Sequence, residues 1–242
     1  MRLLILALVV LSGPAFAQTE PMAQVFSLPA GCTAYLTVQS KDCNVSHHFT
    51  CENYPAGVQG RVDLDSLGAT YIGTIDAETQ WLNSFNPLTG STETLEPGSA
   101  QPASFTQLTT TAINEFDFST RNDQTGLVRF VGDDTLTGNA VTIDGINLEE
   151  TLFHLTAMSE DGTELWHTTG HEYISRDWRM FMSGTGETVL PDGSFKSDGA
   201  PVEFIFPGEP GFLSPNPKFG CGVVTSQADQ SEMTLPATFM AE

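Results

Sequence analysis

The sequence predicts a mainly β protein, an antiparallel meander curved into a barrel, half-barrel or sandwich, with one short helix. Short runs of alternating apolar and polar residues recur along the chain, and Asp-Gly or Thr-Gly pairs stand between many of them. Asp-Gly between two alternating runs is a strong signal for a β-hairpin. The rhythm of strand, helix and strand that builds parallel sheets is missing. Successive hairpins therefore give a meander.

The expected strands begin with a hairpin of Ala34–Ser40 and Cys43–Cys51 around a Lys41-Asp42 turn. The later strands are Gly60–Asp65, Ala69–Asp76, Gln80–Asn86, Asn114–Arg121, Leu127–Gly132, Ala140–Ile143, Leu148–Met158, Glu164–Ile174, Trp178–Gly184 and Val202–Phe206. The one expected helix covers Pro102–Ile113, because proline suits a first helical turn. The pair Asp133-Asp134 is interpreted as a turn or edge charge, since Asp is a common turn residue.

The N-terminus has the pattern of an export signal. Arg2 precedes an apolar run, Leu3–Leu11, that is too short to span a bilayer, and Pro14–Ala17 has the small-residue pattern of a cleavage site. We therefore expect residues 1–17 to be a signal peptide, cleaved near Ala17, and the mature chain to be periplasmic or secreted. Residues 18–221 then form a single β-rich domain, and residues 222–242, which lack periodicity, form a loosely ordered tail.

The 4 cysteines of an exported chain indicate disulfides. With Lys41-Asp42 as a two-residue turn, Cys32 lies opposite Cys51, at a separation that suits a disulfide. Cys43 then pairs with Cys221. The alternative, Cys43–Cys51 with Cys32–Cys221, follows if the register of the hairpin slips.

Three histidines share one face of a later predicted hairpin. With Asp161-Gly162 as the turn, His154, His167 and His171 lie on the same face, and imidazole is a common ligand of zinc and copper. His167 and His171 are about 13 Å apart along a strand, at ~3.3 Å per residue, so the three do not fit one ion. A metal site here needs His154 with one neighbour and a carboxylate from elsewhere. A semi-polar sheet face is the main expectation.

The run Trp178–Met182 is apolar on both faces, apart from Arg179. A strand of this kind is buried on both sides, or it faces a cavity or a partner. The candidate residues for binding an apolar ligand are therefore Trp178, Met180, Phe181 and Met182.

No motif in the sequence assigns a reaction. The signatures of serine hydrolases, P-loop proteins, dinucleotide-binding folds and His-Glu-x-x-His proteases are absent. The net charge of −21, from 30 acidic and 9 basic residues, argues against nucleic acid as a partner. No run after the signal is apolar and long enough for insertion into a membrane.

These absences favour a non-catalytic protein without a cofactor, which binds an apolar small molecule or an envelope protein. One alternative is a metalloprotein or hydrolase that uses the face of His154, His167 and His171. Another is a purely structural module with an acidic, salt-tolerant surface.

Two stretches, Cys32–Cys51 and Pro201–Ser214, resemble an uncharacterised group of small exported bacterial proteins, over most of the mature chain. The resemblance implies a periplasmic or secreted setting. It implies no activity and no functional residue.

Overall fold

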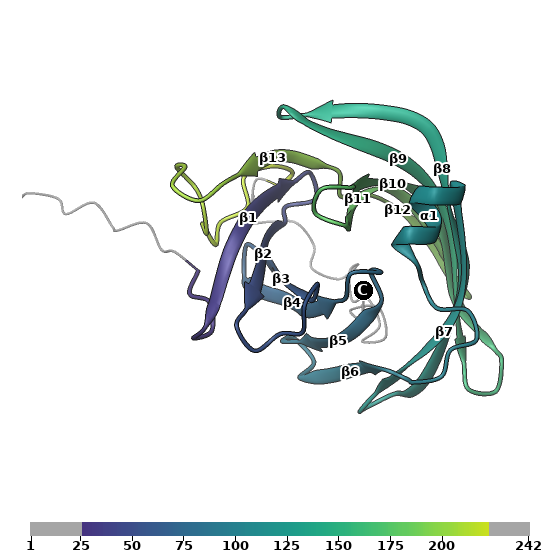
Figure 1. Ribbon diagram of the computed structural model, residues 1–242. Coiled ribbons are helices and arrows are strands. Elements are labelled where there is room, and N and C mark those ends of the chain that lie inside the picture. The colour runs from purple at the N-terminus through teal and green to yellow at the C-terminus, as the bar shows by residue number, and fades with distance from the viewer. Residues whose placement is uncertain (1–25, 223–242) are drawn as a thin grey trace, which may run out of the picture.

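The computed structural model describes residues 26–222, which form one antiparallel sheet of 13 strands with one short helix (Figure 1). The strands β1 to β12 are neighbours in sequence order, and β13 lies beside β1. The predicted mainly β meander is therefore confirmed. The predicted signal peptide and residues 223–242 of the predicted tail lie outside the described residues.

The elements follow one another closely along the chain. They are β1 (Cys32–Ser40), β2 (Val45–Cys51), β3 (Gln59–Asp65), β4 (Gly68–Ile75), β5 (Trp81–Asn86), β6 (Ser91–Leu95), α1 (Phe105–Thr111), β7 (Ile113–Asn122), β8 (Gly126–Ile143), β9 (Ile146–Ser159), β10 (Glu164–Ser175), β11 (Met180–Leu190), β12 (Gly193–Asp198) and β13 (Pro201–Ile205).

Some boundaries differ from the prediction. The two strands expected at Leu127–Gly132 and Ala140–Ile143 are parts of one strand, β8, whose pairing with β9 shifts register between Leu136 and Ala140. Strands β6 and β12 were not predicted, because their sequences are short and mostly polar. Helix α1 is shorter than expected, since the Ser104 side chain caps its start and its C-cap residue has a left-handed backbone.

The first hairpin has the predicted pairing at its cysteines. Cys32 lies opposite Cys51 as expected, although the turn is one residue longer than predicted, because a register shift between Ala34 and Leu36 offsets the extra residue. The disulfides are Cys32–Cys51 and Cys43–Cys221, so the alternative pairing is wrong. Disulfides of this kind indicate an oxidising, extracytoplasmic compartment.

The segment β12–β13 contacts both ends of the meander. Its first part pairs with β11 and its second part with β1. Between them, the Gly199 amide donates to the Gly184 carbonyl at 2.9 Å, and the Lys41 amide donates to the Ala200 carbonyl at 3.1 Å. Because β12 and β13 are the two edges of the hydrogen-bonded order, the sheet is not a closed ladder.

The hairpin β8–β9 extends beyond its neighbours, and its tip lies near β13 in Figure 1. At the tip, the Asp144 carboxylate accepts a hydrogen bond from the Phe204 amide at 2.8 Å. Residues of β1, β9, β11 and β13 pack there in one apolar cluster: Leu36, Val38, Leu148, Met180, Met182 and Phe204. This cluster packs strands from the two ends of the sheet against each other. Within residues 26–222, no helix is long and apolar enough to cross a membrane.

Candidate binding cavity

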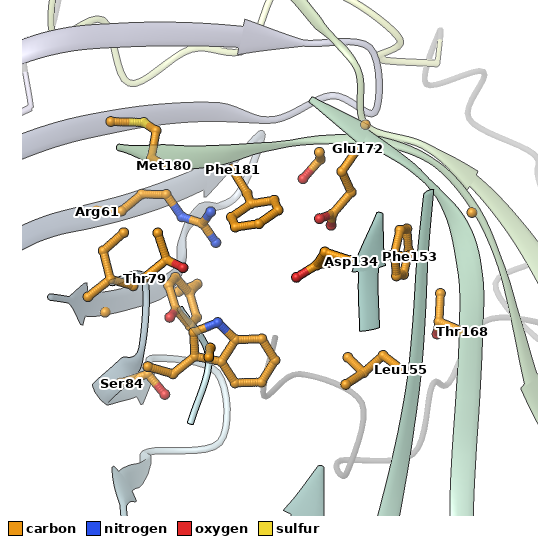
Figure 2. A pocket seen from close by; sticks show the side chains of 18 of the residues that line it. Arg61, Thr79, Ser84, Asp134, Phe153, Leu155, Thr168, Glu172, Met180 and Phe181 are labelled. Atoms are coloured by element: carbon orange, nitrogen blue, oxygen red, sulfur yellow. The ribbon is translucent and has the colours of Figure 1, made fainter. Parts of the chain in front are cut away.

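A cavity of about 480 Å³ lies between the two halves of the sheet (Figure 2). One side carries a polar residue from each of β2 to β6; we call this set the polar wall: His48, Arg61, Tyr71, Ser84 and Glu93. A second set of lining residues is mostly aromatic and comes from the start of β5 and from β7, β9 and β10; we call this set the aromatic wall: Trp81, Phe116, Phe118, Phe153, Leu155 and Trp166. The volume is in the range of small-molecule pockets.

Strand alternation places the aromatic wall on the inner face. On β7, Phe116 and Phe118 point inward, whereas Asp117 between them pairs with Arg129 on the outer face. The cross-strand register continues this face, because Phe118 lies opposite Phe130 on β8. Because successive side chains of a strand point to opposite faces of the sheet, the aromatic rings lie on the inner face and the ion pair lies on the outer face.

The rings of the aromatic wall pack on Phe130 of β8, which does not itself line the cavity, and on one another. Trp81 lies edge-on to Phe118 and to Phe130, with centroids 5.3 Å apart in both pairs, and Phe118 stacks on Phe130 at 5.4 Å. Phe130 also contacts Trp166. Aromatic pairs in these geometries stabilise a core beyond the area they bury. The wall is thus a rigid apolar surface.

The polar wall is held by internal pairs. The Arg61 guanidinium lies 3.1 Å from the Asp63 carboxylate and 5.0 Å from the centre of the Tyr71 ring. Asp63 in turn accepts a hydrogen bond from the Ser46 hydroxyl at 2.6 Å. The positive charge of Arg61 is therefore balanced within the protein.

Burial shifts the pKa values of ionisable side chains on the polar wall, among them those of His48 and Glu93. It lowers the pKa of His48 to about 3, with further lowering by the charges of Arg61 and His47. Burial also raises the pKa of Glu93, although the hydrogen bonds from Thr120 and Asn122 oppose that rise. Near neutral pH, His48 is therefore an uncharged imidazole.

Two acidic residues enter the cavity from the opposite side, Asp134 on β8 and Glu172 on β10 (Figure 2). Asp134 is 8% exposed, and burial raises its pKa to about 7, against the hydrogen bond with Asn114 and with a smaller rise from the charge of Asp133. The interpretation of Asp133-Asp134 as turn or edge charges is wrong, because both lie inside β8. Asp133 faces outward and lies 3.3 Å from His154.

Helix α1 and two turns meet around Arg179. The guanidinium of Arg179 donates to the Ala77 carbonyl at 2.7 Å and to the Glu78 carboxylate at 2.9 Å. Glu78 also accepts hydrogen bonds from Ser104 and Thr106, at the start of α1. These contacts connect the β10–β11 turn, the β4–β5 turn and the helix.

The candidate residues of the Trp178–Met182 run divide between two environments. Phe181 lines the cavity, and its ring packs edge-on against Phe105 of α1. Met180 and Met182 belong to the apolar cluster with Phe204, where Trp178 packs as well, and Met180 also borders the cavity. The run is apolar on both faces because Phe181 contacts the cavity and α1 on one face, and the two methionines pack in the apolar cluster on the other.

The three candidate histidines share the predicted register but not one site. His154 lies opposite Thr169 as expected. Each histidine contacts a different carboxylate: His154 contacts Asp133, His167 contacts Glu164 and His171 contacts Glu150. Over the described range, no group of three or more His, Cys, Asp or Glu side chains is arranged to hold a metal ion. The metal site stays a prediction from the sequence.

Arg61, Asp134 and Glu172 line the cavity, and the sequence did not indicate any of them as a binding residue. The sequence held a signal for Asp134. It lies two and four residues after Gly132 and Phe130 on β8, so its side chain is on the same inward face of the strand. A polar residue on an apolar strand face is informative when that face is known to be buried.

No family model, curated protein or solved structure matches the chain. The cavity is therefore the basis for the functional argument.

Proposed function

We propose that this protein is an exported, non-catalytic binding protein that holds a small apolar molecule between the aromatic wall and the polar wall. The cavity itself carries the proposal. Its volume of about 480 Å³ and its aromatic lining have the character of small-molecule sites, which combine an apolar surface with a few polar groups.

In this proposal the sheet is a curved, barrel-like container. The β12–β13 segment supports this shape, because it pairs with β11 at one end of the meander and with β1 at the other. The disulfides, together with the signal peptide expected at residues 1–17, support a periplasmic or secreted location. The resemblance of Cys32–Cys51 and Pro201–Ser214 to small exported bacterial proteins agrees with this location.

The buried histidine of the cavity is poorly suited to general-base catalysis. His48 lines the cavity, and a general base works best with a pKa near the working pH. Burial instead lowers the pKa of His48 to about 3. Its ring is therefore a weak base at neutral pH.

The test is calorimetric titration with 4-phenylbutanol, a neutral probe with an aromatic body and one polar end. We expect saturable binding of one molecule per chain. Leu155→Trp fills the cavity from the aromatic wall, and it should weaken binding by about ten-fold or more. Leu152→Trp is the matched control, because Leu152 lies on the outer face of the same strand and is 39% exposed.

Absence of saturable binding to the wild-type chain would overturn the proposal. Equal loss of affinity in the two tryptophan variants would do so as well, since it would place the probe outside the cavity. Thermal unfolding of each variant shows that the comparison is made on folded protein.

A further inference from the structure

The charged groups of the cavity are unequally distributed. The ionisable residues that line it are Asp42, His48, Arg61, Tyr71, Glu93, Asp134, His171 and Glu172. Arg61 is the one permanent cation among them, and Asp63 is its ion-pair partner. The acidic side chains therefore outnumber the basic ones, and the single guanidinium already has a counter-charge.

Asp134 and Glu172 enter the cavity close to aromatic rings. Asp134 lies directly opposite Phe153 in the β8–β9 register. Figure 2 shows the carboxylates of Asp134 and Glu172 directed into the same space, with the Phe181 ring beside them and Arg61 across from them. Carboxylates and ring faces thus line one part of the cavity together.

This combination suits one class of ligand. The face of an aromatic ring attracts an organic cation through its quadrupole, and a carboxylate adds a charge-assisted hydrogen bond to an ammonium group. A buried carboxylate is costly to ionise unless a positive charge compensates it. An anionic ligand would meet the acidic side chains with only the paired Arg61 to attract it.

We propose that the cavity binds an organic cation, an apolar molecule with an ammonium group, which Asp134 and Glu172 hold beside Phe153 and Phe181. This inference rests on the proposed function and names the chemical class of its ligand. The net charge of −21 supports it, because such a field raises the local concentration of cations. The pKa of Asp134, raised by burial to about 7, is that of a carboxyl whose charge the protein itself does not compensate.

Three probes with the same phenylbutyl body and different ends test the proposal: 4-phenylbutylamine, 4-phenylbutanol and 4-phenylbutyrate. Calorimetric titrations at about pH 8.5 keep Asp134 ionised and the amine protonated. We expect the amine to bind about ten-fold more tightly than the alcohol, and the acid to bind least tightly.

Matched variants distinguish an effect of the two cavity carboxylates on binding from an effect of the surface charge. Asp134→Asn and Glu172→Gln should each reduce the preference for the amine over the alcohol by about three-fold or more, with little change for the alcohol. Asp133→Asn removes the same charge from the neighbouring residue, whose side chain faces outward beside His154, and it should leave the preference unchanged.

The outcomes separate this inference from the proposed function. If none of the three probes binds, the proposed function fails. If the alcohol binds and the amine binds no more tightly, the inference alone is overturned. Tightest binding of the acid would likewise overturn it and would assign the polar end of the ligand to Arg61. A preference for the amine that Asp133→Asn and Asp134→Asn weaken equally would also contradict it.

Discussion

The two walls of the cavity are stabilised in different ways. On the polar wall, His48 is buried and Arg61 is paired with Asp63. On the aromatic wall, rings pack on rings, as Phe118 does on Phe130. Proton binding should therefore control the stability of the first wall, and side-chain volume that of the second. Predictions from the largest effect to the smallest test this contrast.

Acid should destabilise the protein through His48 of the polar wall and through His47, which lies on the other face of β2 against Thr37 and Phe26. Burial lowers the pKa of His47 to about 4 and that of His48 to about 3, so the unfolded chain binds more protons than the native one below about pH 6.5. Their stabilisation is complete above that pH and is lost as the pH falls toward 3–4. We expect a loss on the order of 4–5 kcal/mol between pH 6 and 4.

Urea unfolding of the wild type and a double variant at a series of pH values isolates this loss as the difference between the two proteins, because Asp134 contributes equally to both. Replacing both buried histidines, His47→Gln with His48→Gln, should flatten the acid slope, even if it lowers stability at neutral pH. His154→Gln is the control, because the side chain of His154 is 61% exposed on the outer face. An equal flattening by the control would refute the assignment.

Truncation of an aromatic side chain should lower the free energy of unfolding more where the ring is fully packed than where it borders the cavity. Phe130 is 3% exposed and contacts Trp81, Phe118 and Trp166, so Phe130→Ala should cost about 3–5 kcal/mol. Phe153 is half-buried and lines the cavity, where part of its surface has no packing partner. Phe153→Ala should cost about half as much or less. Equal costs in denaturant unfolding would show that the cavity around Phe153 is filled by protein.

Asp134 should have the opposite pH dependence to the buried histidines. Because its pKa is raised to about 7 in the folded state, the native chain binds more protons than the unfolded chain between about pH 4 and 7, and stability rises as the pH falls through that window. Asp134→Asn should therefore stabilise the protein at pH 8 by up to about 4 kcal/mol, and the gain should vanish near pH 4.

Chemical unfolding of the wild type and Asp134→Asn at both pH values checks this sign. A variant that is less stable than the wild type at pH 8 would contradict it. The expected gain in stability, together with the loss of amine binding, is the usual trade between stability and function at a binding site.

The three solvent-exposed histidines should have the smallest effect. Alanine at His154, His167 or His171 should change the free energy of unfolding by no more than about 0.5 kcal/mol, since their ion pairs are exposed to solvent. Metal analysis of the purified wild type and variants tests the alternative function at the same time. A stoichiometric metal that these substitutions remove would support the metalloprotein hypothesis instead.

Local signals were enough to predict much of the fold. The predicted pairings of Cys32 with Cys51 and of His154 with Thr169 are both present, and Cys43–Cys221 followed by elimination. Each of the two hairpins nevertheless contains a register shift that the turn residues did not predict, between Ala34 and Leu36 and between Glu164 and Trp166, as β8 does beyond Leu136.

The cavity was less predictable than the strands. Alternation shows that Asp134 and Phe130 share a face, but not that this face meets the polar residues of β2–β6. That arrangement depends on the β12–β13 segment and on the Arg179 contacts with Ala77 and Glu78, which join residues far apart in the chain. The run Trp178–Met182 predicted burial on both sides, a cavity or a partner, and its apolar residues contact both the cavity and an apolar cluster.

The 3 tryptophans give the most direct test of ligand binding in the cavity. Trp81 and Trp166 line the cavity, whereas Trp178 packs against Phe204 and Phe206. In ¹⁵N–¹H spectra recorded during titration with 4-phenylbutanol, we predict that the indole signals of Trp81 and Trp166 shift together with one dissociation constant, while that of Trp178 stays in place. A shift of Trp178 alone, or no shift of any indole signal at saturation, would contradict binding in the cavity.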